Sequence, residues 1–221
     1  MQQRYLRNIG ALTEEEFALL RTKKVFVAGC GGLGGHITDM LLRVGAGSIA
    51  VCDGDVFDAT NLNRQLLCNT GNIGRKKAEC TLEYARIVNP DVRFEAYSEF
   101  LTPENAPRLL EGCDVAIDAL DNVPARRILK AECDGRGIPY VYGAIHGWTC
   151  QCAASAPGDG LIDNIYPTDS VISDKTSLPF TVAACAAMQA SLCVRLLCGR
   201  ETDTGKLYYY DLADMEFAQI G

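Results

Sequence analysis

Short apolar runs recur along the first two thirds of the chain and are separated by more polar segments. Five runs are expected to be strands: KKVFVAG (23–29), SIAVCD (48–53), VRFEAY (92–97), CDVAIDAL (113–120) and IPYVYGAI (138–145). After the first run, Ile37, Met40, Leu41 and Val44 recur at helical spacing. Strands that alternate with helices over short connections predict a Rossmann-like α/β fold, in which helices cover both faces of a mostly parallel sheet.

Capping residues and turn residues set the expected helix boundaries. A helix over 13–22 begins at Thr13, and Glu16 closes a capping box. Further helices are expected over 74–90, where Asn89-Pro90 ends the pattern, over 102–112 with Thr102 as its cap, and over 123–137.

The pattern changes after residue 148. TCQCAASAP (149–157) is expected to be a strand, 157–177 a loop, 178–198 a long helix and KLYYYDL (206–212) a late strand. We expect one domain with three parts: an N-terminal arm and helix (1–22), a core (23–147) and a mixed or antiparallel extension (148–221).

Charge and composition exclude several classes of protein. The net charge of −7 argues against a general surface for nucleic acid or for an anionic membrane. The longest uncharged run, Thr176 to Val194, is short for a membrane span and contains Pro179 and Gln189, so a buried or interface helix is expected. The N-terminus is too polar for a signal peptide, which predicts a cytoplasmic protein.

The eleven cysteines are expected to be free thiols in a reducing compartment. None has the C-x-x-C spacing of a zinc half-site, so no zinc is predicted. Cys150 and Cys152 point to the same face of a predicted strand, where core packing is favoured over a metal or redox site.

A glycine-rich turn follows the first strand. Gly29, Gly31, Gly32 and Gly34 bring backbone N–H groups close to phosphate oxygens at the start of a helix. The second strand ends at Asp53, with Asp55 beside it, where a carboxylate can accept hydrogen bonds from ribose hydroxyls. The pattern predicts a nucleotide site, but an NAD-dependent dehydrogenase would satisfy it equally well.

Further polar residues follow the other strand ends. Asn61 and Arg64 lie in NLNRQ, Lys77 begins a helix, and Asp121 follows the fourth strand. Because ligands of parallel sheets bind at the carboxyl ends of the strands, these side chains can converge on one crevice. Cations and one acid there suit a polyphosphate with Mg²⁺.

These segments together resemble a known family. RYLRN, GCGGLG, CDGDVFDATNLNRQ, GRKKAE and DALDN, in this order, are similar to the ThiF/MoeB/HesA-type adenylyltransferases, bacterial relatives of ubiquitin-activating enzymes. The resemblance runs from about residue 4 to about residue 212. It implies an enzyme that binds MgATP and joins AMP to the C-terminal Gly-Gly carboxylate of a ubiquitin-like sulfur carrier, with release of pyrophosphate.

The resemblance also implies roles for individual residues. Gly32 and its neighbours would hold the nucleotide, Asp53 the ribose, and Asp121, with Asn122 beside it, the Mg²⁺. Asn61, Arg64 and Lys77 would contact the phosphates. Arg7 would reach the site of a partner subunit, which implies a homodimer with the helix around 183–191 as part of the interface.

The chain departs from the family pattern at two places. The C-x-x-C motifs that hold zinc in many relatives are absent near GDGLIDNIYP and near the C-terminus. The stretch SVISDKTSLPF has no cysteine to capture the carrier, and Cys185 falls inside the long helix, where it is expected to be packed. We therefore expect adenylation without an enzyme thioester, with sulfur supplied by a separate donor.

Other functions stay open at this point. An NAD(P)-dependent oxidoreductase lacks a persuasive proton-transfer residue, since His36 and His146 are isolated. A non-catalytic adaptor could bind nucleotide or carrier without turnover, and a related enzyme could activate a tRNA or a small carboxylate. The sequence does not identify the carrier or the pathway.

Overall fold

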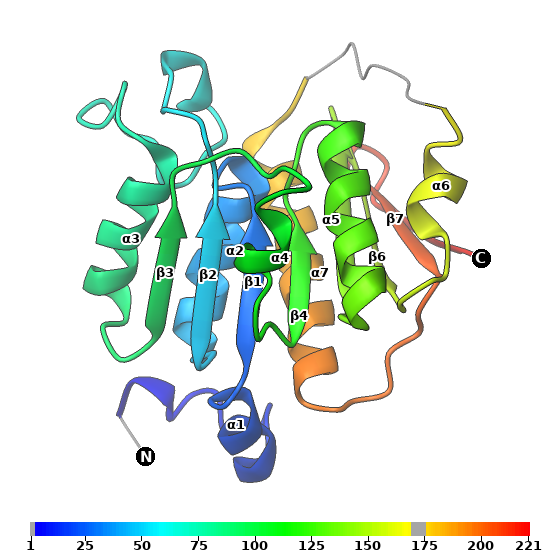
Figure 1. Cartoon of the computed structure of the whole chain (residues 1–221), viewed down its shortest axis with the longest axis horizontal. Helices are drawn as coiled ribbons and strands as arrows, with labels where there is room; N and C mark the ends of the chain where they lie inside the picture. The colour runs from blue at the N-terminus through cyan, green and yellow to red at the C-terminus, as the bar shows by residue number, and fades with distance from the viewer. Residues whose placement is uncertain (1–2, 169–175) are drawn as a thin grey trace.

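The computed structural model describes residues 3–168 and 176–221. Its centre is an eight-stranded sheet with the strand order β3-β2-β1-β4-β5-β6-β7-β8 (Figure 1). The strands are β1 (Lys24–Ala28), β2 (Ser48–Cys52), β3 (Arg93–Tyr97), β4 (Val115–Asp118), β5 (Tyr140–His146), β6 (Thr149–Ser155), β7 (Leu207–Asp211) and β8 (Glu216–Ile220). β1 to β5 are parallel, whereas β6, β7 and β8 each pair antiparallel with the preceding strand. The predicted α/β fold with an antiparallel extension is confirmed.

Helices cover both faces of this sheet, as predicted. They are α1 (Glu14–Leu20), α2 (Gly32–Val44), α3 (Lys77–Val88), α4 (Ala106–Leu109), α5 (Val123–Arg136), α6 (Leu161–Ile165) and α7 (Pro179–Leu197), with short 3₁₀ turns at η1 (Gln3–Tyr5) and η2 (Ala59–Asn61). Alternate residues of β1 enter opposite cores. Val25 and Val27 pack in the core that includes α2, α3 and α7, while Phe26 and Ala28 pack in the core that includes α4, α5 and α6.

The long helix α7 is partly buried in the fold, within the expectation of a buried or interface helix. Its length and apolar composition alone would suffice to cross a membrane, but half of its apolar window is buried inside the fold. It packs against α2, β5 and β6. This is the packing of a core helix.

The structure corrects three local predictions. The expected loop over 157–177 contains the five-residue helix α6, which follows Gly160 in a left-handed conformation. The edge strand β8 was not predicted, because its five residues are all exposed and carry no hydrophobic run. Thr102 does not cap α4 directly. Thr102 and Asn105 exchange backbone-to-side-chain hydrogen bonds, and α4 begins after Asn105.

The N-terminal arm is fixed at the amino ends of the strands, at the edge of the sheet near α1 (Figure 1). Tyr5 is 1% exposed, and its hydroxyl accepts a hydrogen bond from Asn89 Nδ2 at 2.6 Å. Its ring lies against Gly45, where a Cβ would come within 2.7 Å of the ring. The predicted capping box of α1 is present, since Thr13 and Glu16 cap each other's backbone N–H groups. The arm is therefore part of the packed fold.

Candidate active site

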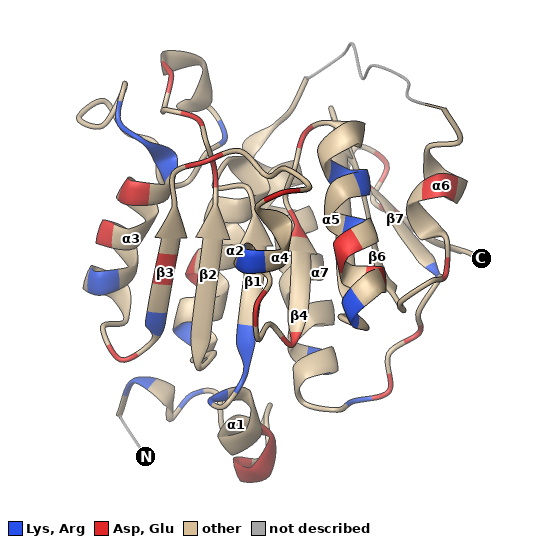
Figure 2. Ribbon diagram, viewed as in Figure 1, with Lys and Arg blue, Asp and Glu red and all other residues tan. Residues whose placement is uncertain are grey.

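A cavity of about 460 Å³ opens at the carboxyl ends of the parallel strands. Its wall is formed by the glycine turn after β1, by the segments that follow β2, β3 and β4, and by the start of α7. Figure 2 shows basic positions on the segment that leads into α3 and acidic positions on the segments that follow β2 and β4. Crevices of this size at this edge of a parallel sheet are the usual place for a nucleotide-sized ligand.

Two glycines of this turn cannot carry a side chain, and the turn also leads into the start of α2 at the cavity. A Cβ on Gly34 would lie 1.8 Å from the carbonyl oxygen of Gly29, and Gly29 itself has a φ of 103°. Neither position accepts a side chain without moving the turn. Gly31 and Gly32 line the cavity at the start of α2, and Gly31 makes no side-chain cap. The first N–H groups of α2 therefore remain available to an anionic ligand there.

Asp53 is held against this turn by its own carboxylate. Its Oδ2 accepts the backbone N–H of Cys30 at 2.7 Å, and its Oδ1 accepts that of Asp55 at 2.8 Å. A carboxylate oxygen can accept more than one hydrogen bond, so lone pairs remain for ribose hydroxyls. The carboxylate is preorganised by the backbone at the end of β2.

Two basic side chains line the cavity. Lys77 is the first residue of α3 and only 7% exposed, and its Nζ lies 3.1 Å from Asp55 Oδ2. The guanidinium of Arg64 donates to the backbone oxygen of Thr60 at 3.0 Å and to Asn63 Oδ1 at 2.9 Å. Both residues line the cavity, and the Lys77 ammonium is paired with an acid that a phosphate could replace.

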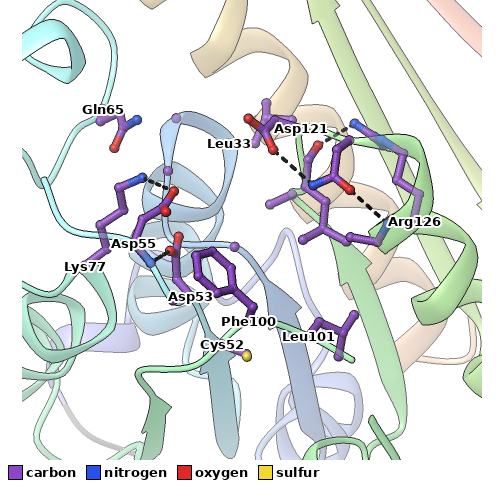
Figure 3. Close-up of a pocket in the computed structure, with 18 of the residues that line it drawn as sticks. Leu33, Cys52, Asp53, Asp55, Gln65, Lys77, Phe100, Leu101, Asp121 and Arg126 are labelled. Atoms are coloured by element: carbon purple, nitrogen blue, oxygen red, sulfur yellow. Dashed lines mark hydrogen bonds and ion pairs between the residues drawn. The ribbon is translucent and has the colours of Figure 1, made fainter. Parts of the chain in front are cut away.

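Asp121 stands across the cavity from Lys77 (Figure 3). It follows β4, and one of its carboxylate oxygens accepts a hydrogen bond from Asn122 Nδ2 at 3.3 Å. Asn122 caps α5 by accepting the backbone N–H of Ala125 at 2.9 Å. The capped helix start therefore positions the acid.

Most of the predicted site residues meet in this cavity. Those that line it are Gly29, Gly31, Gly32, Asp53, Asp55, Arg64, Lys77, Asp121 and Asn122. Gly34 is buried behind the turn. Arg7 is exposed and belongs to the arm, which lies at the amino ends of the strands, away from the cavity of its own chain (Figure 1).

Asn61 takes a different position from the one expected. It is 8% exposed and is not among the residues of the cavity wall. Its Oδ1 accepts the backbone N–H of Asp58 at 3.1 Å and closes the capping box of η2. The side chain stabilises the turn that carries Arg64, and its phosphate contact stays a prediction.

A buried ion pair under the Asp121 segment was missed by sequence reasoning. Arg126 of α5 lies 2.6 Å from Asp118 of β4, with side-chain exposures of 3% and 0%. Asp118 also accepts a hydrogen bond from the Tyr140 hydroxyl and from the backbone N–H of Leu120. Arg126 in turn donates to the carbonyl oxygen of Leu120. The backbone N–H and carbonyl groups of Leu120, the residue before Asp121, are thus both fixed by this ion pair. Nothing in the sequence signalled the contact, because Arg126 is only one of two consecutive arginines in a predicted helix.

Gln65 also lines the cavity and was not predicted. It is 7% exposed, and its side chain is the nearest neighbour that a Cβ on Gly31 would meet, at 3.6 Å. The signal was present in NLNRQ, whose last residue it is.

The eleven cysteines are all buried. Burial raises the pKa of Cys52, which lines the cavity, to about 12, so its thiol stays protonated at neutral pH. The hydrogen bond that Cys185 donates to Cys150, together with burial, raises the pKa of Cys185 well above its ordinary value. Cys150 and Cys152 share the core that contains α7, as expected for packing residues.

The donor set fits Mg²⁺ that arrives with a nucleotide. Within residues 3–168 and 176–221, no three His, Cys, Asp or Glu side chains form a group that could hold a metal by themselves. Mg²⁺ is commonly bound by one or two carboxylates together with substrate phosphates, so Asp121 is of the chemical type that would hold it here. The absence of zinc stays a prediction.

The chain is similar to proteins of a known family. The model of the ThiF family matches residues 5–220. The SAMP-activating enzyme E1 of Haloferax volcanii is 32% identical over 215 residues, which cover 91% of this chain and 77% of that protein. The sulfur carrier protein adenylyltransferase of Thermus thermophilus is 30% identical over 233 residues, which cover 99% of this chain and 84% of the relative.

Other relatives are longer than this chain or share only its fold. A probable adenylyltransferase/sulfurtransferase MoeZ of Mycobacterium tuberculosis is 30% identical over 91% of this chain, but the match spans only 54% of that protein. The solved structure of Escherichia coli MccB with ATP has a TM-score of 0.86 at 19% identity and covers 100% of this chain and 72% of that one. PaaA has a TM-score of 0.78 at 21% identity and covers 93% and 66% of the two chains. At these identities the two structures bear on the fold alone.

Proposed function

The chain belongs to the ThiF family, and we propose from this that it adenylates the C-terminal Gly-Gly carboxylate of a ubiquitin-like sulfur-carrier protein. The co-substrate is MgATP and the second product is pyrophosphate. One observation carries the proposal: the glycine turn, Asp53, Arg64, Lys77 and Asp121 all line a single cavity. The named adenylyltransferases among the relatives support the reaction class.

Each side chain has a defined task in this reaction. The N–H groups at the start of α2 bind the phosphates, and Asp53 accepts the ribose hydroxyls. Asp121 holds the Mg²⁺ that the nucleotide brings. Lys77 exchanges Asp55 for a phosphate oxygen, and with Arg64 it neutralises the departing pyrophosphate.

The chemistry requires no nucleophile from the protein. A carboxylate oxygen of the carrier attacks the α-phosphorus, a new P–O bond forms, and the bond to the pyrophosphate oxygen breaks with its electron pair. The products are an acyl adenylate and pyrophosphate. Positioning and neutralisation of charge supply the rate enhancement.

We further propose that no enzyme thioester forms and that a separate protein delivers the sulfur. The burial of all eleven cysteines supports this, as does the raised pKa of Cys185. The stretch SVISDKTSLPF, which carries no cysteine, lies largely outside the described residues.

The proposed assembly is a cytoplasmic homodimer of single adenylation domains. A second cavity, of about 350 Å³, lies between α2 and α7 and includes Met40, Ala187 and Ala190. It supports an interface near residues 183–191. A partner subunit would then supply Arg7 to the cavity, and residues 148–221 would bind the carrier.

Pyrophosphate exchange into ATP tests the reaction. Exchange should require both ATP and a carrier that ends in Gly-Gly. Asp121→Ala and Arg64→Ala should each lower the rate by about 100-fold or more, because each removes charge stabilisation of the transition state. Arg86→Ala replaces an exposed arginine on α3, away from the cavity, and should retain the wild-type rate.

Three results would contradict the proposal or its assigned residues. Full exchange activity in Asp121→Ala would remove the assigned metal ligand. Binding of the carrier with no exchange would favour a non-catalytic adaptor, and binding of NADH without ATP would favour an oxidoreductase.

A further inference from the structure

The nucleotide cavity has an apolar side that the phosphate-binding residues do not explain. Phe100, which follows β3, lines the cavity although the residue is 65% exposed. Figure 3 shows its ring between Asp53 and Leu101. A large apolar side chain that faces a ligand cavity is a candidate contact for an apolar part of the ligand.

The ring is held in place by its surroundings. It packs on Gly54, where a Cβ would come within 2.6 Å of the ring, so the residue after Asp53 must be small. The carbonyl oxygen of Phe100 accepts a hydrogen bond from Asn105 Nδ2 at 2.8 Å. The preceding residue, Glu99, is fixed by Arg108 and also by Asn105. The segment that carries the ring is therefore tied to the start of α4.

The order of groups along a nucleotide indicates what reaches this ring. The start of α2, Arg64 and Lys77 lie on the phosphate side of the cavity, and Asp53 marks the ribose. The base must then extend from Asp53 away from the cations. Figure 3 shows Phe100, Cys52 and Leu101 on that side. Apart from Glu99, these lining residues are apolar, and the Cys52 thiol is already engaged with the carbonyl oxygen of Glu99.

We propose that Phe100 stacks on the base of the bound nucleotide and is the residue that gives the site its preference for a purine. This rests on the proposed use of ATP. Stacking on an aromatic side chain is favourable for every base, and the larger purine ring covers more of the phenyl face. The exposed ring of the free protein is thereby removed from water.

Calorimetric binding of ATP, CTP and inorganic tripolyphosphate tests the role directly. Phe100→Ala should weaken ATP binding about tenfold or more, weaken CTP binding less, and leave tripolyphosphate binding unchanged. Phe100→Tyr and Phe100→Trp should restore ATP affinity, whereas Phe100→Leu should not. Phe217→Ala removes a phenylalanine of similar exposure (55%) from β8 and should bind all three ligands as the wild type does.

The outcomes separate this inference from the reaction itself. Equal ATP affinity in Phe100→Ala and wild type would overturn stacking and leave adenylation standing. A parallel loss of ATP and tripolyphosphate binding would show a structural role instead, and full rescue by Phe100→Leu would show that any apolar group suffices. If the wild-type protein binds tripolyphosphate but not ATP, both proposals fail.

Discussion

The ion pairs differ in burial. A pair with two buried partners stabilises the fold, whereas a pair with one exposed partner is the one that a nucleotide would break. Asp118 and Arg126 are both inaccessible, while Lys77 is buried but its partner Asp55 has a side-chain exposure of 56%. Phosphate can therefore reach Lys77 by displacing an acid that remains solvated. At the surface, Glu16 of α1 joins Arg200, which follows α7, through two hydrogen bonds of 2.6 and 2.8 Å.

The Glu16 contact predicts an acid-dependent part of the stability. The hydrogen bonds from Arg200 and from the Thr13 backbone lower the pKa of Glu16 from 4.5 to about 2. A lowered pKa stabilises the folded protein above pH 4.5, and this contribution is lost as the pH falls towards 2. We expect the Tm difference between wild type and Glu16→Gln to be constant above about pH 5.5 and to vanish near pH 2.

Thermal unfolding followed by circular dichroism from pH 7 to pH 2 measures this difference. Glu216→Gln, on the exposed strand β8, serves as the control and should unfold like the wild type at pH 7. A Tm difference that stays the same down to pH 2 would contradict the assigned ion pair.

At the scale of elements, the cavity is built where strands end and helices begin. α2 starts at the glycine turn, α3 starts at Lys77, and α5 starts after Asn122. The short segment between β4 and α5 carries Asp121, and the pair of Arg126 and Asp118 fixes its backbone through Leu120. The rigidity of this connection, rather than that of Asp121 itself, sets where a metal ligand would stand.

Breaking this pair should cost much of the stability. Arg126→Met leaves Asp118 buried without its cation, and we expect the free energy of unfolding to fall by about 3–5 kcal/mol in urea titrations. Adding Asp118→Leu removes the unpaired charge, so the double variant should lose less than the single one.

The matched control is Arg86→Met on the exposed face of α3, which should change stability by no more than about 0.5 kcal/mol. A similar small change in Arg126→Met would show that the buried pair does not stabilise the segment.

At the scale of the whole molecule, the carboxyl ends and the amino ends of the strands carry different parts of the proposed site. The cavity occupies the carboxyl ends of the strands, and the arm with Arg7 occupies the amino ends (Figure 1). Tyr5 anchors the arm between Gly45 and Asn89, so Arg7 is presented outward by a packed support. An arginine at this place can contribute to catalysis only in another copy of the chain.

Subunit complementation tests this arrangement. Arg7→Ala and Asp121→Ala should each be inactive in pyrophosphate exchange, because the first lacks the donated arginine and the second lacks the metal ligand. After the two variants are mixed and allowed to reassociate, heterodimers contain one complete site, and about a quarter of the wild-type site number should recover.

Mixing either variant with itself is the control and should restore nothing. Full activity of Arg7→Ala alone, or no recovery after confirmed subunit exchange, would contradict a site shared between subunits.

The local pattern of the chain predicted the parallel core and the capping box of α1, because burial on both faces and helix caps depend on neighbouring residues. It also marked the residues that would line the cavity. The glycines, Asp53, Arg64, Lys77 and Asp121 each follow a strand or begin a helix, and the carboxyl ends of parallel strands meet at one edge. Strand β8 and helix α6 escaped this logic because one is exposed throughout and the other is a single short turn.

What the sequence by itself determined is the fold, the family and the chemical identity of the side chains that we propose to bind phosphate. Only the tertiary structure decided which way those side chains face: Asn61 turns into its own 3₁₀ turn, Arg126 pairs under the cavity, and Phe100 lies beside Asp53. The Asn61 cap is a local contact with Asp58, but only the structure shows that it keeps this side chain out of the cavity wall. For Arg126 and Phe100 the physical reason is that their positions depend on how α5 packs against β4 and how β3 pairs with β2. Such contacts leave no periodicity in the sequence from which they could be predicted.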